Sequence, residues 1–145
     1  MNNQALTFSE RYNTWTLYAL SLLRIVAGFL FMQHGLQKVF GQLGGQPVPL
    51  GSQVGVGGII ELVGGALLVF GLLTRPAAFI MSGTMAVAYF QMHMLPAMDK
   101  DPNWFWPIVN KGESAALYSF VFLFLAVAGA GPWSIDALIA KRKNP

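Results

Sequence analysis

The chain has 145 residues, of which 54% are hydrophobic and 10% charged, with a net charge of +3 and no cysteine. Soluble domains usually carry about 25% charged residues, so this composition indicates a membrane protein. The lack of cysteine excludes disulfides, thiolate metal sites and thiol redox relays, and the scattered basic residues do not indicate nucleic-acid binding.

Four apolar segments follow one another along the chain, over about 15–40, 54–73, 76–95 and 113–130. Each is close to the ~20 residues that cross a bilayer as a helix. Period-2 alternation is absent, so the segments do not read as strands of a barrel. The sequence therefore predicts an all-α integral membrane four-helix bundle, with residues 1–145 as a single membrane domain.

A short C-terminal amphipathic helix is predicted over 135–143, with Ser134 as its cap and its apolar face lying on the membrane surface. Four spans place both termini on one side of the membrane. Five basic residues fall on that side and three on the other: Arg11, Arg75, Lys141, Arg142 and Lys143 against Lys38, Lys100 and Lys111. The positive-inside rule then predicts that both termini are cytoplasmic.

Two charges lie within the apolar cores of the first two segments, Arg24 within 15–32 and Glu61 within 54–73. An isolated charge in hydrocarbon is costly, so each needs a partner. Glycines share or flank the helix faces that carry these charges, which indicates close helix contacts there: Gly28 and Gly35, then Gly57, Gly64 and Gly65. Because the two charges differ in height by only about 6 Å, the sequence predicts that Arg24 pairs with Glu61.

One geometric detail favours a different partner for Glu61. Helical side chains lean toward the N-terminus of their own helix, so Arg24 leans inward and Glu61 leans outward, toward His34 and His93. Two interpretations stay open, a structural pair that fixes helix register and a proton or ligand site. The candidates for ligand binding or proton relay are Arg24, His34, Lys38, Glu61, His93 and Glu113.

The start of the fourth segment also has two interpretations. Asn110 and Glu113 have the spacing of a capping box, and the alternative places Glu113 at the outer mouth of a site. The Met- and His-containing run 89–98 predicts no metal site, because Met92 and Met94 lie about 200° apart on a helix. No complete catalytic motif, such as a P-loop or a zinc spacing, indicates an enzyme.

Several short motifs occur in a characteristic order: Arg24 with Gly28, Gly35 and Lys38; Glu61 with Gly64-Gly65; GLLTR at 71–75; Gly112-Glu113; and GPWSID at 131–136. Together, over about residues 17–137, they resemble the DoxX family of small four-span membrane proteins. The resemblance implies a four-helix bundle in a bacterial inner (plasma) membrane. It also implies a redox link, since the family takes its name from a subunit associated with quinol oxidation, and relatives are linked to thiosulfate:quinone oxidoreduction and oxidative-stress complexes.

The leading hypothesis is an accessory subunit of a redox or quinone-linked membrane complex, with Arg24, His34, Glu61 and His93 lining a polar intramembrane cavity. The alternatives are a transporter of a small molecule or protons and a structural membrane interaction protein. Any enzymatic role would be that of a quinone-linked oxidoreductase subunit, and a quinone is the one cofactor that the hypothesis suggests. The lipid bilayer is the expected surrounding, and the candidate partners are a redox protein or a second copy of the chain.

Overall fold

The structure is a computed structural model that describes residues 8–143, with side chains described from Asn13 onward, and every regular element in this part of the chain is helical. The prediction of an all-helical protein is therefore confirmed. The helices are α1 (Phe8–Phe40), α2 (Gln53–Phe70), α3 (Thr74–Ala88), α4 (Leu95–Met98), α5 (Pro107–Asn110), α6 (Glu113–Ala128) and α7 (Ile135–Lys143), with a π-helical segment η1 (Tyr89–Met94) between α3 and α4.

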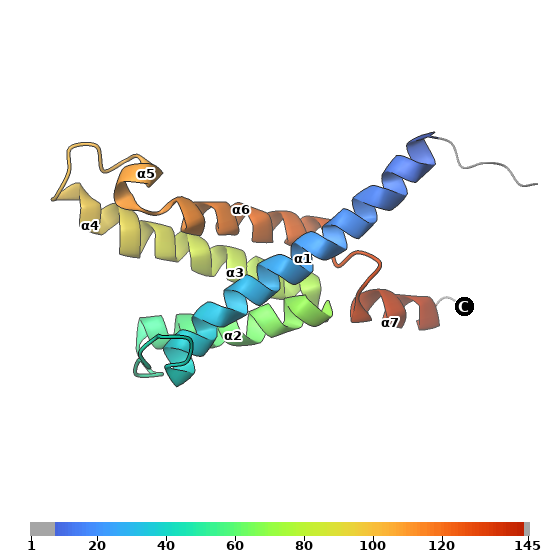
Figure 1. The fold of residues 1–145 in the computed structure, drawn as a ribbon, viewed down its shortest axis with the longest axis horizontal. Coiled ribbons are helices and arrows are strands. Elements are labelled where there is room, and N and C mark those ends of the chain that lie inside the picture. Colours follow the sequence, from blue (N-terminus) through green and yellow to red (C-terminus); the bar gives the residue numbers. More distant parts are fainter. Residues whose placement is uncertain (1–7, 144–145) are drawn as a thin grey trace, which may run out of the picture.

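Four long helical stretches make up the body of the molecule (Figure 1). Residues 13–40 of α1 and the whole of α2 are long and apolar enough to cross a membrane, and α6 is a shorter apolar helix. The stretches α3, η1 and α4 follow one another without a break over residues 74–98. Both ends of the described chain lie at one end of the molecule, which we call the α7 end, and α4 and α5 lie at the opposite end.

The distribution of side chains is inverted relative to a soluble domain. Large apolar residues are exposed on each long helix, among them Phe29, Phe79, Phe120 and Val127. The interior holds a small apolar core together with polar and charged groups, including Arg24 and Glu61. Soluble monomers rarely expose so much contiguous apolar surface, so this surface is suited to lipid.

Helices α1 and α2 pack through glycines. A Cβ atom added to Gly35 would lie 2.4 Å from the backbone nitrogen of Leu62, and one added to Gly65 would lie 2.7 Å from the Gly28 carbonyl oxygen. Only hydrogen fits at these positions, and the two backbones therefore approach closely. These contacts bring the C-terminal half of α1 against α2, and the candidate site is built beside them, around Glu61.

Helix caps stabilise the α7 end of the molecule. Gly71 adopts the left-handed conformation that ends α2, with a φ of 65°. The Asp136 carboxylate then accepts hydrogen bonds of 2.9 Å from the backbone N–H groups of Leu73 and Thr74, and so caps α3 from a distant part of the chain. Ser134 caps α7 as predicted, since its hydroxyl accepts from the Ala137 N–H at 3.1 Å.

Candidate functional site

Arg24 is fully buried and bonded to the backbone at the α7 end. Its guanidinium donates to the carbonyls of Leu68, Val69, Ala130 and Trp133, at 2.8 Å for Ala130 and 3.0 Å for Val69. Backbone carbonyls carry partial negative charge, most of all near the C-terminal end of a helix, so several of them together can replace a carboxylate as partners of a cation. The predicted Arg24–Glu61 pair is therefore wrong, and Arg24 joins α1 to the end of α2 and to the segment before α7.

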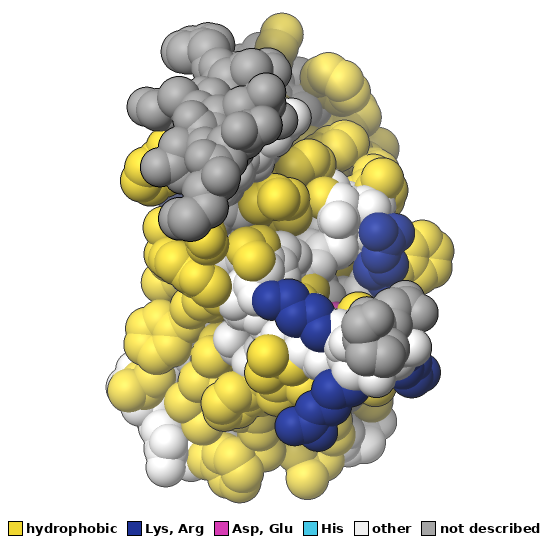
Figure 2. Space-filling view, turned by 90° about the vertical axis from the view of Figure 1, so that its right-hand side faces the viewer, with side chains coloured by type: hydrophobic (Ala, Val, Ile, Leu, Met, Phe, Trp, Pro, Cys, Tyr) yellow, Lys and Arg dark blue, Asp and Glu magenta, His cyan; other side chains and the backbone are white. Residues whose placement is uncertain are grey.

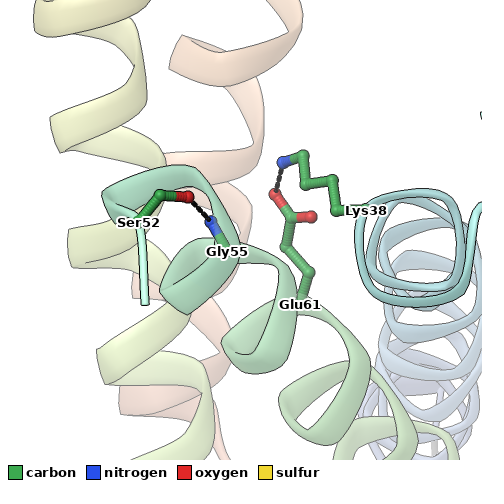
Figure 3. A network of polar contacts seen from close by, with 4 residues as sticks. All are labelled: Lys38, Ser52, Gly55 and Glu61. Carbon is green, nitrogen blue, oxygen red and sulfur yellow. Dashed lines mark hydrogen bonds and ion pairs between the residues drawn. The ribbon is translucent and has the colours of Figure 1, made fainter. Parts of the chain in front are cut away.

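Glu61 pairs instead with Lys38, from the last turn of α1 (Figure 3). The Lys38 Nζ atom lies 2.5 Å from Glu61 Oε1. The carboxylate is almost completely buried, with 3% of its side chain exposed, whereas 32% of the lysine side chain is exposed. Among the described residues, the buried Oε2 atom of Glu61 has no hydrogen-bond partner. The pair therefore leaves one strong acceptor free.

The direction of side chains on a helix explains why the predicted pairing failed. Arg24 and Glu61 lie on antiparallel helices, and each side chain leans toward the N-terminus of its own helix. Arg24 consequently reaches the α7 end, and Glu61 reaches the opposite end, where α1 terminates. The two positions differ little in height, but their side chains point in opposite directions, so the two charges do not meet.

Glu61 and Lys38 line a cavity of about 480 Å³ between α1, α2, α3, η1 and α6. His34 and His93 also line it, so four of the six predicted site residues come together there. Most of the wall is apolar, and Phe31 and Tyr118 form its aromatic part, with ring centroids 5.7 Å apart. A mainly apolar cavity with a few converging polar groups is the usual form of a small-molecule site.

Two predicted candidates lie outside this lining. Arg24 belongs to the α7 end, as described above. Glu113 is exposed at the first position of α6, and Gly112 occupies the N-cap position. The predicted capping box is not formed, because the Asn110 side-chain oxygen accepts from the Gly112 N–H at 2.8 Å rather than from the Glu113 N–H.

The π-helical segment η1 shapes one wall of the cavity. It contributes Gln91, Met92 and His93 to the lining. Nδ1 of His93 lies 3.3 Å from the Asn110 carbonyl oxygen, which ties η1 to α5. A carbonyl can only accept, so this contact places a proton on Nδ1. π-Helical turns are rare and frequently mark functional sites, because they alter the direction of side chains within a helix.

Comparison with known proteins identifies the family. The DoxX family model matches residues 19–94, just over half of the chain. An uncharacterized protein of Haemophilus influenzae is 41% identical over 129 residues, which cover 86% of this chain and 93% of the relative. The chain belongs to the DoxX family. No solved structure gives a significant match.

Two further relatives extend the DoxX comparison. The inner membrane protein YqjF of Escherichia coli is 30% identical, over 82% of this chain and 90% of the relative. The putative oxidoreductase CatD of Bacillus subtilis is 26% identical, over 85% of this chain and 88% of the relative. This chain is thus a membrane protein of the DoxX type. The segment matched by the family runs from within α1 to the end of η1, and it includes the Lys38–Glu61 pair and both histidines.

Several polar residues of the DoxX cavity escaped the sequence analysis. Gln53 and Gln91 are in the lining, and the hydrogen bond that Gln53 donates to Gln91 joins the start of α2 to η1. Thr84 and Ser114 are also in the lining. A signal for Gln91 was available, since it is an amide within an otherwise apolar segment. Gln53 and Ser114 gave no such signal, because they are polar residues at helix starts, where polar residues are common.

Proposed function

We propose that this protein is a four-span inner-membrane subunit of a redox complex, and that its cavity binds the ring of a quinone-class molecule. The observation that carries the proposal is the chemistry of the cavity wall. A planar, mainly apolar ring would lie against Phe31 and Tyr118, while the polar atoms of the ring would meet Glu61, His34 and His93.

The four proposed spans are α1, α2, the continuous stretch 74–98 and α6. At 1.5 Å per residue, the 25 positions of 74–98 are long enough to cross ~30 Å of hydrocarbon. α6 has 16 residues and is short for a span, but the α5 segment precedes it closely. The exposed aromatic residues Phe105 and Trp106, between α4 and α5, are suited to the membrane–water interface.

The packing favours a binding site over a transport path. On the buried face of α1, Arg24 is followed by Ala27 and then by Phe31, whose ring forms part of the cavity wall. Phe31 packs edge-to-face on Phe122, with ring centroids 4.8 Å apart, and both are fully buried. Close-packed aromatic side chains leave no room for a hydrated solute. A ligand would enter and leave on the same side.

Filling the cavity tests the proposal. An atom added at Gly57, which lines the cavity, meets nothing within 4 Å, so Gly57→Phe should place a ring in the cavity without displacing the backbone. Gly83 is equally open but exposed and outside the lining, so Gly83→Phe is the matched control.

The measurement is the amount of isoprenoid quinone that co-purifies with each protein in native-lipid nanodiscs. We expect quinone with the parent protein and with Gly83→Phe, and a loss of most of it with Gly57→Phe. Equal amounts in all three proteins, or none in the parent protein, would contradict a quinone site in this cavity.

A further inference from the structure

We infer that the α7 end binds the headgroup of an anionic phospholipid, in the hollow beside Arg75. The inferred lipid site is separate from the proposed quinone cavity and lies toward the other end of the molecule. Three features indicate it: an arginine without a partner, an excess of basic side chains, and aromatic residues that place the headgroup layer of a membrane at this level.

The hollow has a volume of about 440 Å³ and lies between the start of α3, the end of α6 and the first turn of α7. Arg75 lines it and is exposed, and among the described residues its guanidinium has no hydrogen-bond or ion-pair partner. A Cβ atom added to Gly129 would lie 3.3 Å from the Arg75 Nε atom, so the glycine leaves room beside the guanidinium. Arginine binds phosphate oxygens through two parallel hydrogen bonds, and a phosphodiester therefore suits this group.

Basic side chains predominate around the hollow, and Figure 2 shows them gathered at the α7 end. Arg75 and the last turn of α7 supply four exposed positive charges, and Asp136 is the one acidic side chain described there. Both Asp136 oxygens are bonded to the start of α3, and a single carboxylate offsets only one of the four charges. Apart from the buried Arg24, the rest of the described chain has no such excess, with three basic and four acidic side chains: Lys38, Lys100 and Lys111 against Glu61, Asp99, Asp101 and Glu113.

Aromatic side chains place the headgroup layer at the level of the hollow. The ring centroid of Tyr18 lies 5.0 Å from that of Trp133 and 6.4 Å from that of Trp15. Tryptophan and tyrosine concentrate at the membrane–water interface. Trp133 directly precedes Ser134, the cap of α7, and the first turn of α7 lines the hollow. The hollow therefore lies where phosphates of a lipid layer are found.

The surface of α7 favours a lipid over an acidic protein as the source of the anion. Ile135, Leu138 and Ile139 are exposed on the same short helix as its three basic residues. A helix of this kind lies in the interface, with apolar side chains toward the acyl chains and charges among the headgroups. From Ala137 in the hollow to Lys143 the helix rises about 9 Å, so Arg75 and the basic turn can face headgroups of one lipid layer.

The experiment measures dissociation constants of two lipids for the delipidated protein in detergent micelles, by native mass spectrometry. The probes are dioleoylphosphatidylglycerol and dioleoylphosphatidylcholine, which share their acyl chains and the phosphodiester but differ in net charge. One basic side chain near an anionic headgroup corresponds to about 5-fold in affinity, and two correspond to about 30-fold. We expect phosphatidylglycerol to bind about 5- to 30-fold more tightly than phosphatidylcholine.

Arg75→Gln assigns this preference to the hollow. The substitution removes a charge that has no partner among the described residues, so the fold should be kept. The preference should fall about 5-fold, which is the effect of one basic side chain. Lys100→Gln makes the same change of charge at an exposed position outside the hollow, and it should keep the preference.

The other outcomes overturn the lipid site in different ways. Equal binding of the two lipids by the parent protein overturns it and leaves an acidic protein surface as the partner of these basic residues. A preference unchanged by Arg75→Gln, or lowered as much by Lys100→Gln, shows that the hollow is not the site. Displacement of phosphatidylglycerol by inorganic phosphate at equal concentration shows a site for a free anion only. The Gly57→Phe experiment tests the quinone cavity separately, whichever result is obtained here.

Discussion

At the scale of single residues, this protein stabilises its two intramembrane charges by different means. Arg24 is bonded to four backbone carbonyls, whereas Glu61 is bonded to a lysine that extends along the end of α1. The first arrangement is saturated with hydrogen bonds and lies in a closed region. The second leaves an acceptor free beside a cavity. This difference favours a structural role for Arg24 and the proposed ligand-binding role for Glu61, although both residues stood out equally in the sequence.

We expect Arg24→Lys to destabilise the protein. A lysine has the charge but only three donors at a single point, so it cannot satisfy carbonyls on both sides of a planar guanidinium. At least one buried carbonyl would lose its partner, which costs about 1–3 kcal/mol. The measurement is the free energy of unfolding in mild detergent. Arg142→Lys, an exposed position on α7, is the control and should match the parent; equal stability of Arg24→Lys would contradict the backbone-anchoring role.

The Lys38–Glu61 pair should show coupling in a double-mutant cycle. Lys38→Met leaves a buried carboxylate unpaired, so adding Glu61→Gln should recover part of the lost stability, with an interaction energy of about 0.5–3 kcal/mol. Arg24→Gln and Glu61→Gln share no partner, so their effects should add within about 0.5 kcal/mol. Unfolding free energies of the single and double variants test both statements. Additivity of the first pair, or coupling of the second, would show that the ion pair is assigned to the wrong residue.

At the scale of elements, the glycine contact between α1 and α2 sets the position of the site. Gly58 packs on the Cβ atom of Lys38, and Gly35 packs on the backbone of Leu62, next to Glu61. A wider separation of the two helices would move the ammonium away from the carboxylate. The close packing is therefore required for the ion pair as well as for stability.

Gly35→Ala tests this contact with a single methyl group. The added carbon would lie 2.4 Å from the Leu62 nitrogen, so a backbone must move, at a cost of about 1–3 kcal/mol. The same change at Gly83 meets open space and should be neutral or stabilising by up to about 1 kcal/mol, because alanine is the better helix former. Thermal unfolding in detergent compares the two. A Gly35→Ala protein that unfolds at or above the temperature of Gly83→Ala would contradict the close packing.

At the scale of the whole molecule, the distribution of charge and the position of the chain ends favour one orientation in the membrane. Figure 2 views the α7 end, where Lys and Arg side chains gather against hydrophobic surface. The last turn of α7 carries Lys141, Arg142 and Lys143, all exposed. Both ends of the described chain lie at this end (Figure 1), as the four proposed spans would require.

We predict that the α7 end faces the cytoplasm. A fluorescent protein that matures only in the cytoplasm should be active when fused after Pro145, and an alkaline phosphatase that matures only outside should be inactive there. The same two reporters inserted in the connection between α1 and α2, at Gly44, should give the opposite result. Phosphatase activity at the C-terminal fusion would reverse the proposed orientation, and with it the side from which a ligand reaches the cavity.

The sequence by itself determined the features that depend on local pattern. Hydropathy and length identified the helical stretches, and Ser134 identified the start of α7 to the residue, because a cap acts on the turn beside it. Composition identified a membrane protein. The order of short motifs, finally, identified the DoxX family.

Only the tertiary structure decided which groups meet. The carbonyls of Ala130 and Trp133 lie 106 and 109 positions from Arg24 in the chain, and no spacing rule connects residues so far apart. Spacing along the helices gave the approximate heights of Arg24 and Glu61 but not their partners, since the partners depend on how antiparallel helices pack and on the opposite directions in which their side chains lean. The cavity beside Glu61 likewise exists only because five helical segments come together around it.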